Sequence, residues 1–242
     1  MKIKYKNRAP KGFTLVELLV VIAIIAGLAA MSYGPIMKNI KKSKQTEAIN
    51  NMRQILMSLQ NFSVDNDGMY PNEDTTRTGQ DGSTLEGCFN QLLSGKYINE
   101  EKYFYSQVNA EVILTSTKGP DNDNNLTTDE CTTGYVRGLS STSKPEAPIL
   151  FDSAVSPAKF DTAVWDGFAI VARIDQSVKA MPIDFSGELD TEDGGSKTGP
   201  IVEERGNRKV NIFRKPFLPR SADVLVPSGA AHAGSESYTD ED

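Results

Sequence analysis

A single apolar stretch near the start dominates the hydrophobic pattern of this 242-residue chain. Residues Phe13 to Tyr33 hold only one charged side chain, that of Glu17, among apolar and small residues. A helix over these residues would span about 31 Å, which matches the hydrocarbon thickness of a bilayer. The pattern therefore predicts one transmembrane helix over residues 13–34.

The helical pattern continues beyond the apolar stretch and becomes amphipathic. Gly34-Pro35 marks a kink or a loosened turn at the expected membrane exit. After it, apolar residues recur at helical spacing along one face. They are Ala48, Met52, Ile55, Leu59 and Phe62. The turn signal Asp65-Asn66-Asp67-Gly68 and the following Tyr70-Pro71 end the pattern. We expect residues 35–71 to extend the helix outside the membrane, with the apolar stripe packed under a sheet.

Short apolar segments separated by polar turns follow, and they predict an antiparallel sheet. A short helix is expected within residues 89–104. Candidate strands are Val112-Ile113-Leu114, Tyr135-Val136 and Ile149-Leu150-Phe151. The clearest pair is a hairpin formed by residues 168–174 and 178–183 around the turn Asp175-Gln176-Ser177. The whole pattern predicts an α+β fold, with a small antiparallel-sheet head over residues 72–185.

Residues 186–242 are interpreted as a polar, partly disordered C-terminal extension. Within it, basic and apolar residues alternate in a stretch that would dock on a partner or lie over the head. The basic residues are Arg205, Arg208, Lys209, Arg214, Lys215 and Arg220.

The charge distribution predicts the orientation of the helix across the membrane. The formal net charge is −6, yet the first twelve residues hold five basic side chains and no acid. Basic residues before an apolar span favour a cytoplasmic start. We therefore expect a single-pass inner-membrane protein whose C-terminal head lies in the periplasm. The acidic body argues against nucleic acid as a partner.

A cleaved secretory signal peptide is the alternative interpretation of the apolar stretch. Ala26, Ala29 and Ala30 are small enough to resemble its cleavage site. However, the carboxylate of Glu17 inside the apolar stretch costs about 3 kcal/mol unless it finds a partner. A discarded peptide supplies no such partner.

The residues Lys11-Gly12-Phe13-Thr14-Leu15-Val16-Glu17-Leu18 resemble the prepilin motif of type IV pilins and type II secretion pseudopilins. The resemblance implies that a prepilin peptidase removes residues 1–12, a cytoplasmic leader, by cutting after Gly12. It also implies methylation of the new N-terminal residue, Phe13. In this family the acid that matches Glu17 pairs with the free amine of a neighbouring subunit, which gives the carboxylate its partner. The resemblance therefore places processing at Gly12 and Phe13, and assembly at Glu17.

Two weaker resemblances bear on the type of filament. The turn at residues 65–71 is similar to that of major pseudopilins, and this favours the secretion pseudopilus over the pilus. The turn at Asp175 is similar to a pilin-like terminal hairpin, except that Gln176 replaces the usual glycine. The sequence thus predicts a structural filament subunit of either system, inserted in the inner membrane and then exported in a pilus, in a pseudopilus or to the cell surface. The alternative is a minor, tip-located subunit or a membrane-anchored adhesin that uses the motif for sorting.

The head offers little chemistry for catalysis. The only histidine, His232, lies in the acidic tail, and the sequence has neither a Gly-x-Gly-x-x-Gly nor a Walker loop. We predict no enzymatic activity. Cys88 and Cys131 are expected outside the cytoplasm, where they form either a disulfide or two buried thiols.

One loop carries acids at a spacing similar to the start of an EF-hand: Asp121, Asp123, Asn125 and Asp129. Leu126 and Thr132 stand where that loop needs its glycine and its bidentate glutamate. Major pseudopilins bind calcium in a head loop, whereas a solvated turn is the simpler interpretation. We predict no cofactor and leave calcium open.

Overall fold

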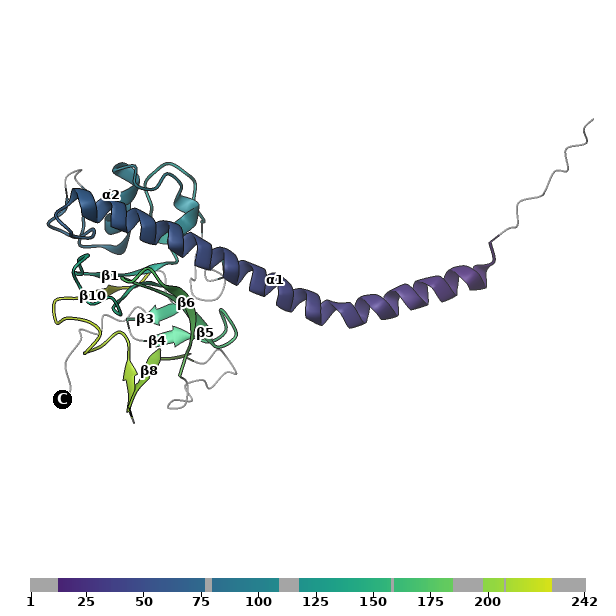
Figure 1. The fold of residues 1–242 in the computed structure, drawn as a ribbon. Helices are drawn as coiled ribbons and strands as arrows, with labels where there is room; N and C mark the ends of the chain where they lie inside the picture. Colours follow the sequence, from purple (N-terminus) through teal and green to yellow (C-terminus); the bar gives the residue numbers. More distant parts are fainter. Residues whose placement is uncertain are drawn as a thin grey trace, which may run out of the picture. The chain divides into compact units, whose positions relative to one another are not determined.

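A computed structural model describes residues 13–76, 80–108, 118–157, 159–184, 198–206 and 208–227. The chain forms two compact units, Met1–Ser43 and Lys44–Asp242. One helix, α1 (Leu15–Asp65), belongs to both units, and every other described element belongs to the second (Figure 1). We refer to the second unit as the head.

The part of α1 in the first unit is apolar and exposed. The large side chains from Phe13 to Ile40 are accessible to solvent, including Leu18, Ile25 and Met31. The helix runs without interruption through Gly34 and Pro35. Among the described residues, α1 is the one helix with the length and composition needed to cross a membrane. The expected long apolar N-terminal helix is confirmed.

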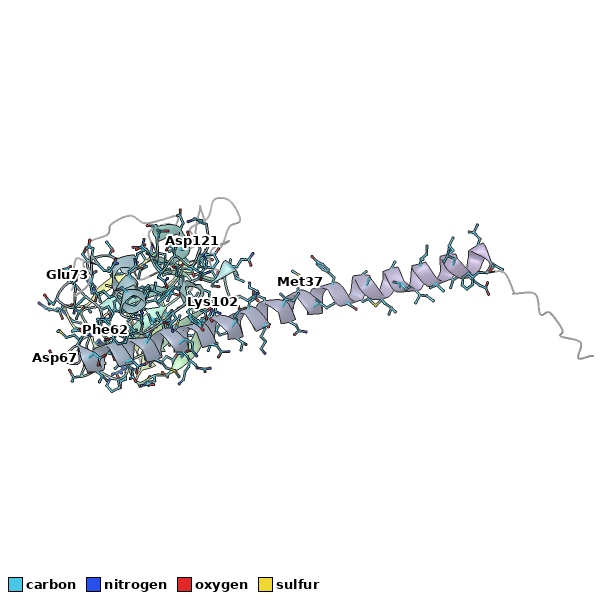
Figure 2. All side chains as sticks on the ribbon, turned by 90° about the horizontal axis from the view of Figure 1, so that it is seen from above. Met37, Phe62, Asp67, Glu73, Lys102 and Asp121 are labelled. Atoms are coloured by element: carbon cyan, nitrogen blue, oxygen red, sulfur yellow. The ribbon has the colours of Figure 1, made fainter. Side chains whose placement is uncertain are left out.

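The part of α1 in the head buries one face. Met52, Ile55, Leu59 and Phe62 are at most 4% exposed, and Ala48 is partly buried against the same core, which confirms the predicted stripe. The helix ends where expected, because the residues after Asp65 take left-handed conformations, with φ of 54° at Asp67 and 81° at Gly68. Gly68 N donates a hydrogen bond to Ser63 O over 2.8 Å, which satisfies a carbonyl of the last turn. Figure 2 labels Phe62 and Asp67 at this end of the helix.

A short helical layer follows α1. It contains α2 (Leu85–Ser94) and the single turns η1 (Glu101–Phe104) and η2 (Thr128–Glu130). The hydroxyl of Thr84 accepts a hydrogen bond from Gly87 N and so caps α2. Phe89 of α2 packs against Phe104 and Tyr135, with ring centroids 4.6 and 5.6 Å away. These rings join the helical layer to the sheet.

The main sheet has five antiparallel strands in the order β10-β1-β2-β5-β6. The bounds are β1 (Gly134–Arg137), β2 (Pro148–Phe151), β5 (Phe168–Arg173), β6 (Val178–Pro182) and β10 (Asp223–Leu225). The predicted strands at residues 135–136 and 149–151 and the predicted hairpin are all present, and Ala172 pairs with Val178 beside the hairpin turn. The candidate strand at residues 112–114 lies outside the described residues. The sheet confirms the predicted α+β fold.

The hairpin turn holds Gln176 in the left-handed region, with φ of 69°. This conformation favours glycine, the residue that the resemblance led us to expect there. Asp175 Oδ1 accepts a hydrogen bond from Ser177 N and thereby supports the turn. The turn is therefore made despite the replacement of glycine.

A second layer contains the remaining strands. β3 (Ala154–Ser156), β4 (Lys159–Asp161) and β7 (Thr198–Gly199) form one sheet, and β8 (Val202–Arg205) and β9 (Arg208–Asn211) form a two-stranded hairpin. Phe151, Phe160 and Phe213 pack together between the layers, with ring centroids 5.0 to 5.8 Å apart. The core therefore lies on both sides of the main sheet.

The described part of the C-terminal extension differs from our expectation. Residues 198–227 contribute four strands, and β10 forms an edge of the main sheet by pairing Tyr135 with Leu225. Ile212, Phe213 and Phe217 are at most 1% exposed. The head therefore continues beyond residue 185, because these apolar side chains complete its core. Residues 185–197 and 228–242 lie outside the described residues.

A buried carboxyl group connects the sheet to the loop that follows β4. Asp152 is 3% exposed, and its Oδ1 accepts a hydrogen bond from Ile170 N over 2.6 Å. Its Oδ2 accepts another from Trp165 Nε1, also over 2.6 Å. Burial raises the pKa of Asp152 to about 6, against these hydrogen bonds, which favour the ionised form.

We expect this carboxyl group to make the head less stable as the pH rises from about 4 to about 6. The unfolded chain loses the proton near pH 4 and the folded chain near pH 6, so the folded state binds more protons between these values. The free energy of unfolding should therefore fall by about 3 kcal/mol across this window from Asp152 alone. Urea unfolding, followed by the fluorescence of Trp165, the only tryptophan, measures it.

Asp152→Asn serves as the reference, because other carboxyl groups titrate in the same range. The variant cannot ionise, so the difference between wild type and variant isolates the contribution of Asp152. A difference that stays constant from pH 4 to pH 7 would contradict the prediction.

Candidate functional site

The candidate assembly site lies at the start of α1. Phe13, the first described residue, is 72% exposed. Gly12 and the expected leader, residues 1–12, lie outside the described residues. Phe13 and Glu17 are therefore the two predicted site residues that the structure places.

Thr14 and Glu17 form a reciprocal pair of hydrogen bonds. Glu17 N donates to Thr14 Oγ1 over 3.2 Å, and Thr14 N donates to Glu17 Oε2 over 2.9 Å. The Thr14 hydroxyl donates to the same Oε2 over 2.8 Å. This is a capping box, in which the first free amides of a helix are satisfied by side chains three residues apart. The helix therefore starts at Leu15 because the neighbouring side chains of Thr14 and Glu17 bind its first free amides.

The sequence analysis missed the role of Thr14. The signal was present, because a threonine followed three residues later by a glutamate at the start of an apolar run predicts a capping box. We had considered Glu17 only as the partner of another copy.

The capping box leaves part of the Glu17 carboxylate unused. Both hydrogen bonds to the carboxylate end on Oε2, and none that starts from a described residue ends on Oε1. No other acid follows along α1 before Glu47. The helix thus presents one oriented carboxylate oxygen among exposed apolar side chains. Such an oxygen can accept a hydrogen bond from a cationic group.

The two cysteines are free thiols and do not form the disulfide that we had considered. Both are fully buried, which is the alternative that the sequence left open. The Sγ of Cys88 lies 3.2 Å from Gly82 O, and that of Cys131 lies 3.4 Å from Thr133 O. Burial raises the pKa of Cys88 to about 12 and also raises that of Cys131. Neither thiol is therefore activated as a nucleophile.

The acidic loop is organised around a residue that the sequence did not indicate. Carboxylate oxygens of Glu101, Asp121 and Asp123 lie within 4.8 Å of one another, whereas Asp129 is not part of this group. Glu101 is 1% exposed. Its two oxygens accept hydrogen bonds from backbone amides of the loop at residues 122, 124 and 125.

A side-chain cation also lies at this loop. Lys118 Nζ lies 2.6 Å from Asp121 Oδ2 and 3.4 Å from Glu130 Oε1. The hydrogen bond from Lys118 holds the pKa of Asp121 below its ordinary value. Calcium prefers six to eight oxygen ligands. Backbone amides and Lys118 thus give these carboxylates partners within the head, and the three carboxylates are also close enough to hold a metal ion together. The calcium hypothesis stays a prediction.

Comparison with known proteins agrees with the motif at the start of the chain. Residues 7–33 match the family described as the prokaryotic N-terminal methylation motif. The chain is 36% identical over 67 residues to the type IV major pilin protein PilA of Myxococcus xanthus (strain DK1622). This similarity covers 28% of the chain and 30% of that pilin. No solved structure matches the chain significantly.

The similarity therefore concerns less than a third of the length of the matched pilin. It is joined by a fold of the expected type, in which an apolar helix continues into a small antiparallel-sheet head. The N-terminal motif, the helix that carries it and the likeness to a major pilin therefore make the chain similar to type IV pilins over less than a third of its own length.

Proposed function

We propose that the protein is a structural subunit of a filament, either a type IV pilus or a type II secretion pseudopilus. The observation that carries this proposal is the oriented carboxylate of Glu17 on an exposed apolar helix. A carboxylate on a helix that enters a membrane requires a compensating charge. The α-amine of Phe13 from another copy would supply that charge and would join the two helices.

The prepilin peptidase would create this amine by cutting between Gly12 and Phe13 and would then methylate it. The cut lies before the apolar segment, so the mature chain keeps its helix. The helix would anchor the subunit in the inner membrane, with the head in the periplasm, until assembly buries the helix among copies of itself. The apolar side chains from Phe13 to Ile40 would then form the filament core.

The choice between the two filaments depends on cellular context. The matched relative is a major pilin, which supports the pilus, whereas the turn at residues 65–71 supports the pseudopilus. Deletion of the gene separates them. Loss of surface filaments identifies a pilus subunit, and periplasmic retention of secreted proteins identifies a pseudopilus subunit.

A minor subunit at the filament tip, or an adhesin, is the second candidate. The observation that favours it is the segment at residues 198–227, which adds the hairpin β8–β9 and the edge strand β10 to the head. Copy number separates these roles, because a major subunit is abundant in sheared filaments and a tip subunit is scarce.

Gly12→Ala tests the processing step. We expect the variant to keep residues 1–12, because the peptidase recognises this glycine at the cut, and to remain outside filaments. Mass spectrometry of the purified chain and sequencing of its N-terminus measure the result. Gly27→Ala is the matched control for processing, because Gly27 lies away from the cut and a methyl group there contacts no other segment of the same copy within 4 Å. A Gly12→Ala chain that begins at Phe13 would disprove the assigned cut.

A further inference from the structure

Basic side chains gather at one hairpin of the head. Residues 205–220 hold six of the 26 lysines and arginines of the chain and no acid. Five of them lie on or directly after the hairpin β8–β9, and all five are exposed. We define them as the basic surface: Arg205, Arg208, Lys209, Arg214 and Lys215.

Ion pairs within the head account for most charges of this hairpin, but not for that of Arg208. β8 and β9 pair only with each other among the described strands, and their register places Arg205 opposite Arg208. Like charges directly opposite on two strands destabilise a hairpin. Arg205 is paired with Glu146, whereas Arg208 forms no ion pair with any described residue. Lys209 lies opposite Glu204 and is paired with Asp184, so Arg208 is the basic residue of these two strands whose charge has no partner within the described part of one copy.

A second surface of the head carries the opposite charge. We define it as the acidic surface: Asp65, Asp67, Glu73 and Asp74, all exposed. Glu73 is paired with Arg137, and Asp65 accepts a hydrogen bond from the Tyr97 hydroxyl. The carboxylates of Asp67 and Asp74 have no ion pair within the described part of the chain. The last turn of α1 contains no basic residue, so the negative end of the helix dipole adds to this surface.

The two surfaces lie apart on the head. Figure 1 shows the β8–β9 hairpin on the side away from α2 and from the C-terminal end of α1. In Figure 2, Asp67 is labelled at that end of α1, and Glu73 is labelled on the same side of the head. The basic surface of one copy therefore cannot neutralise its own acidic surface. Complementary surfaces at two different places on one molecule produce a head-to-tail contact, which continues from copy to copy.

We propose that the basic surface of one copy binds the acidic surface of the next copy in the filament. This inference rests on the proposed function, because it assigns a contact between heads within that filament. A second copy fits better than an anionic polymer for two reasons. The chain has a net charge of −6, which opposes binding to a polyanion. The chain itself carries carboxylates without an ion pair within its described part, those of Asp67 and Asp74, and these could pair with Arg208.

The test uses two full-length variants with reversed charge. Arg208→Glu makes the basic surface less positive, and it also replaces the like-charged pair with Arg205 by an attractive pair. Weaker pairing of the two strands therefore does not explain a defect. Asp67→Lys with Asp74→Lys reverses the charge of the two unpaired acids and removes the net negative charge of the acidic surface, and Asp67→Asn with Asp74→Asn controls for the shape of the turn. We expect each reversed variant alone to yield about tenfold fewer sheared filaments, as a loss of attraction at every contact requires.

Co-expression of the two reversed variants gives the decisive result. The new carboxylate of the Arg208→Glu chain can pair with the new ammonium groups of the other chain, and the unchanged Arg208 of that chain can pair with the unchanged Asp67 and Asp74. The two chains can therefore alternate, and filaments should recover to within about threefold of wild type. The inference is overturned if each variant assembles normally alone, or if co-expression restores nothing. It is also overturned if Arg208→Glu assembles normally but loses retention on heparin, which would identify an anionic polymer as the ligand.

Glu17→Ala, expressed in the same strain, separates this inference from the proposed function. Normal assembly of the Glu17 variant would contradict the proposed pairing of Glu17 with the amine of Phe13 in another copy, and with it the proposed function. A defect in the Glu17 variant together with normal assembly of both head variants would contradict only the contact between heads.

Discussion

Replacement of Glu17 by alanine is expected to leave the chain processed but absent from filaments. The peptidase acts at Gly12, five positions before the removed carboxylate, so the mature mass should differ from wild type only by the substitution. Assembly, in contrast, would lose the anion that binds the amine of Phe13 in another copy. A charge pair in an apolar environment contributes about 3 kcal/mol, so incorporation should fall about a hundredfold. Mass spectrometry of membrane fractions and quantification of sheared filaments measure the two effects.

Two further variants separate the charge of Glu17 from its role in the capping box. Glu17→Gln keeps an acceptor for the hydrogen bonds of Thr14 but removes the charge. Thr14→Val keeps the charge but removes the hydroxyl that orients the carboxylate. We expect Glu17→Gln to be as defective as Glu17→Ala, and Thr14→Val to be less defective than either. Filaments that contain Glu17→Gln at the wild-type level would refute the charge pair.

The elements that the sequence predicted well are those with local causes. The apolar run, the stripe from Met52 to Phe62 and the turn at Asp67-Gly68 follow from periodicity over many residues, and the structure contains all three. The hairpin of β5 and β6 was equally clear, because both strands and their turn are contiguous. The capping role of Thr14 could also have been predicted, since a capping box is defined by only four consecutive residues.

The features that escaped prediction depend on partners far away in the chain. β10 has three residues and pairs with β1, about ninety positions earlier. A segment this short shows no periodicity, and the surrounding basic residues conceal the buried ones. Glu101 was missed for the same reason, because its carboxylate binds backbone amides more than twenty positions away. The state of Cys88 and Cys131 depends on the distance between them in space, which a spacing in sequence does not fix.

This account of the C-terminal segment leads to a second large effect. Replacement of Phe213 by alanine is expected to destabilise the head by about 4 kcal/mol. The ring of Phe213 is 1% exposed and packs 5.0 Å from Phe151 and 5.1 Å from Phe160, centroid to centroid. Its removal leaves a cavity between the two sheet layers that rigid strands cannot fill. A loss of this size approaches the whole stability of many domains. Urea unfolding of the full chain in detergent, followed by Trp165 fluorescence, measures it.

Phe168→Ala provides the matched control, because it removes the same ring from a site that is 41% exposed on β5. We expect this variant to lose about 1 kcal/mol, since much of the ring already contacts water. The comparison tests where the head ends. Phe213 lies beyond residue 185, where the sequence predicted that the head ends. If residues 198–227 complete the core, Phe213→Ala must nevertheless be several-fold more destabilising than Phe168→Ala. Equal losses for the two variants would mean that this segment only lies over a head that is already complete at residue 185.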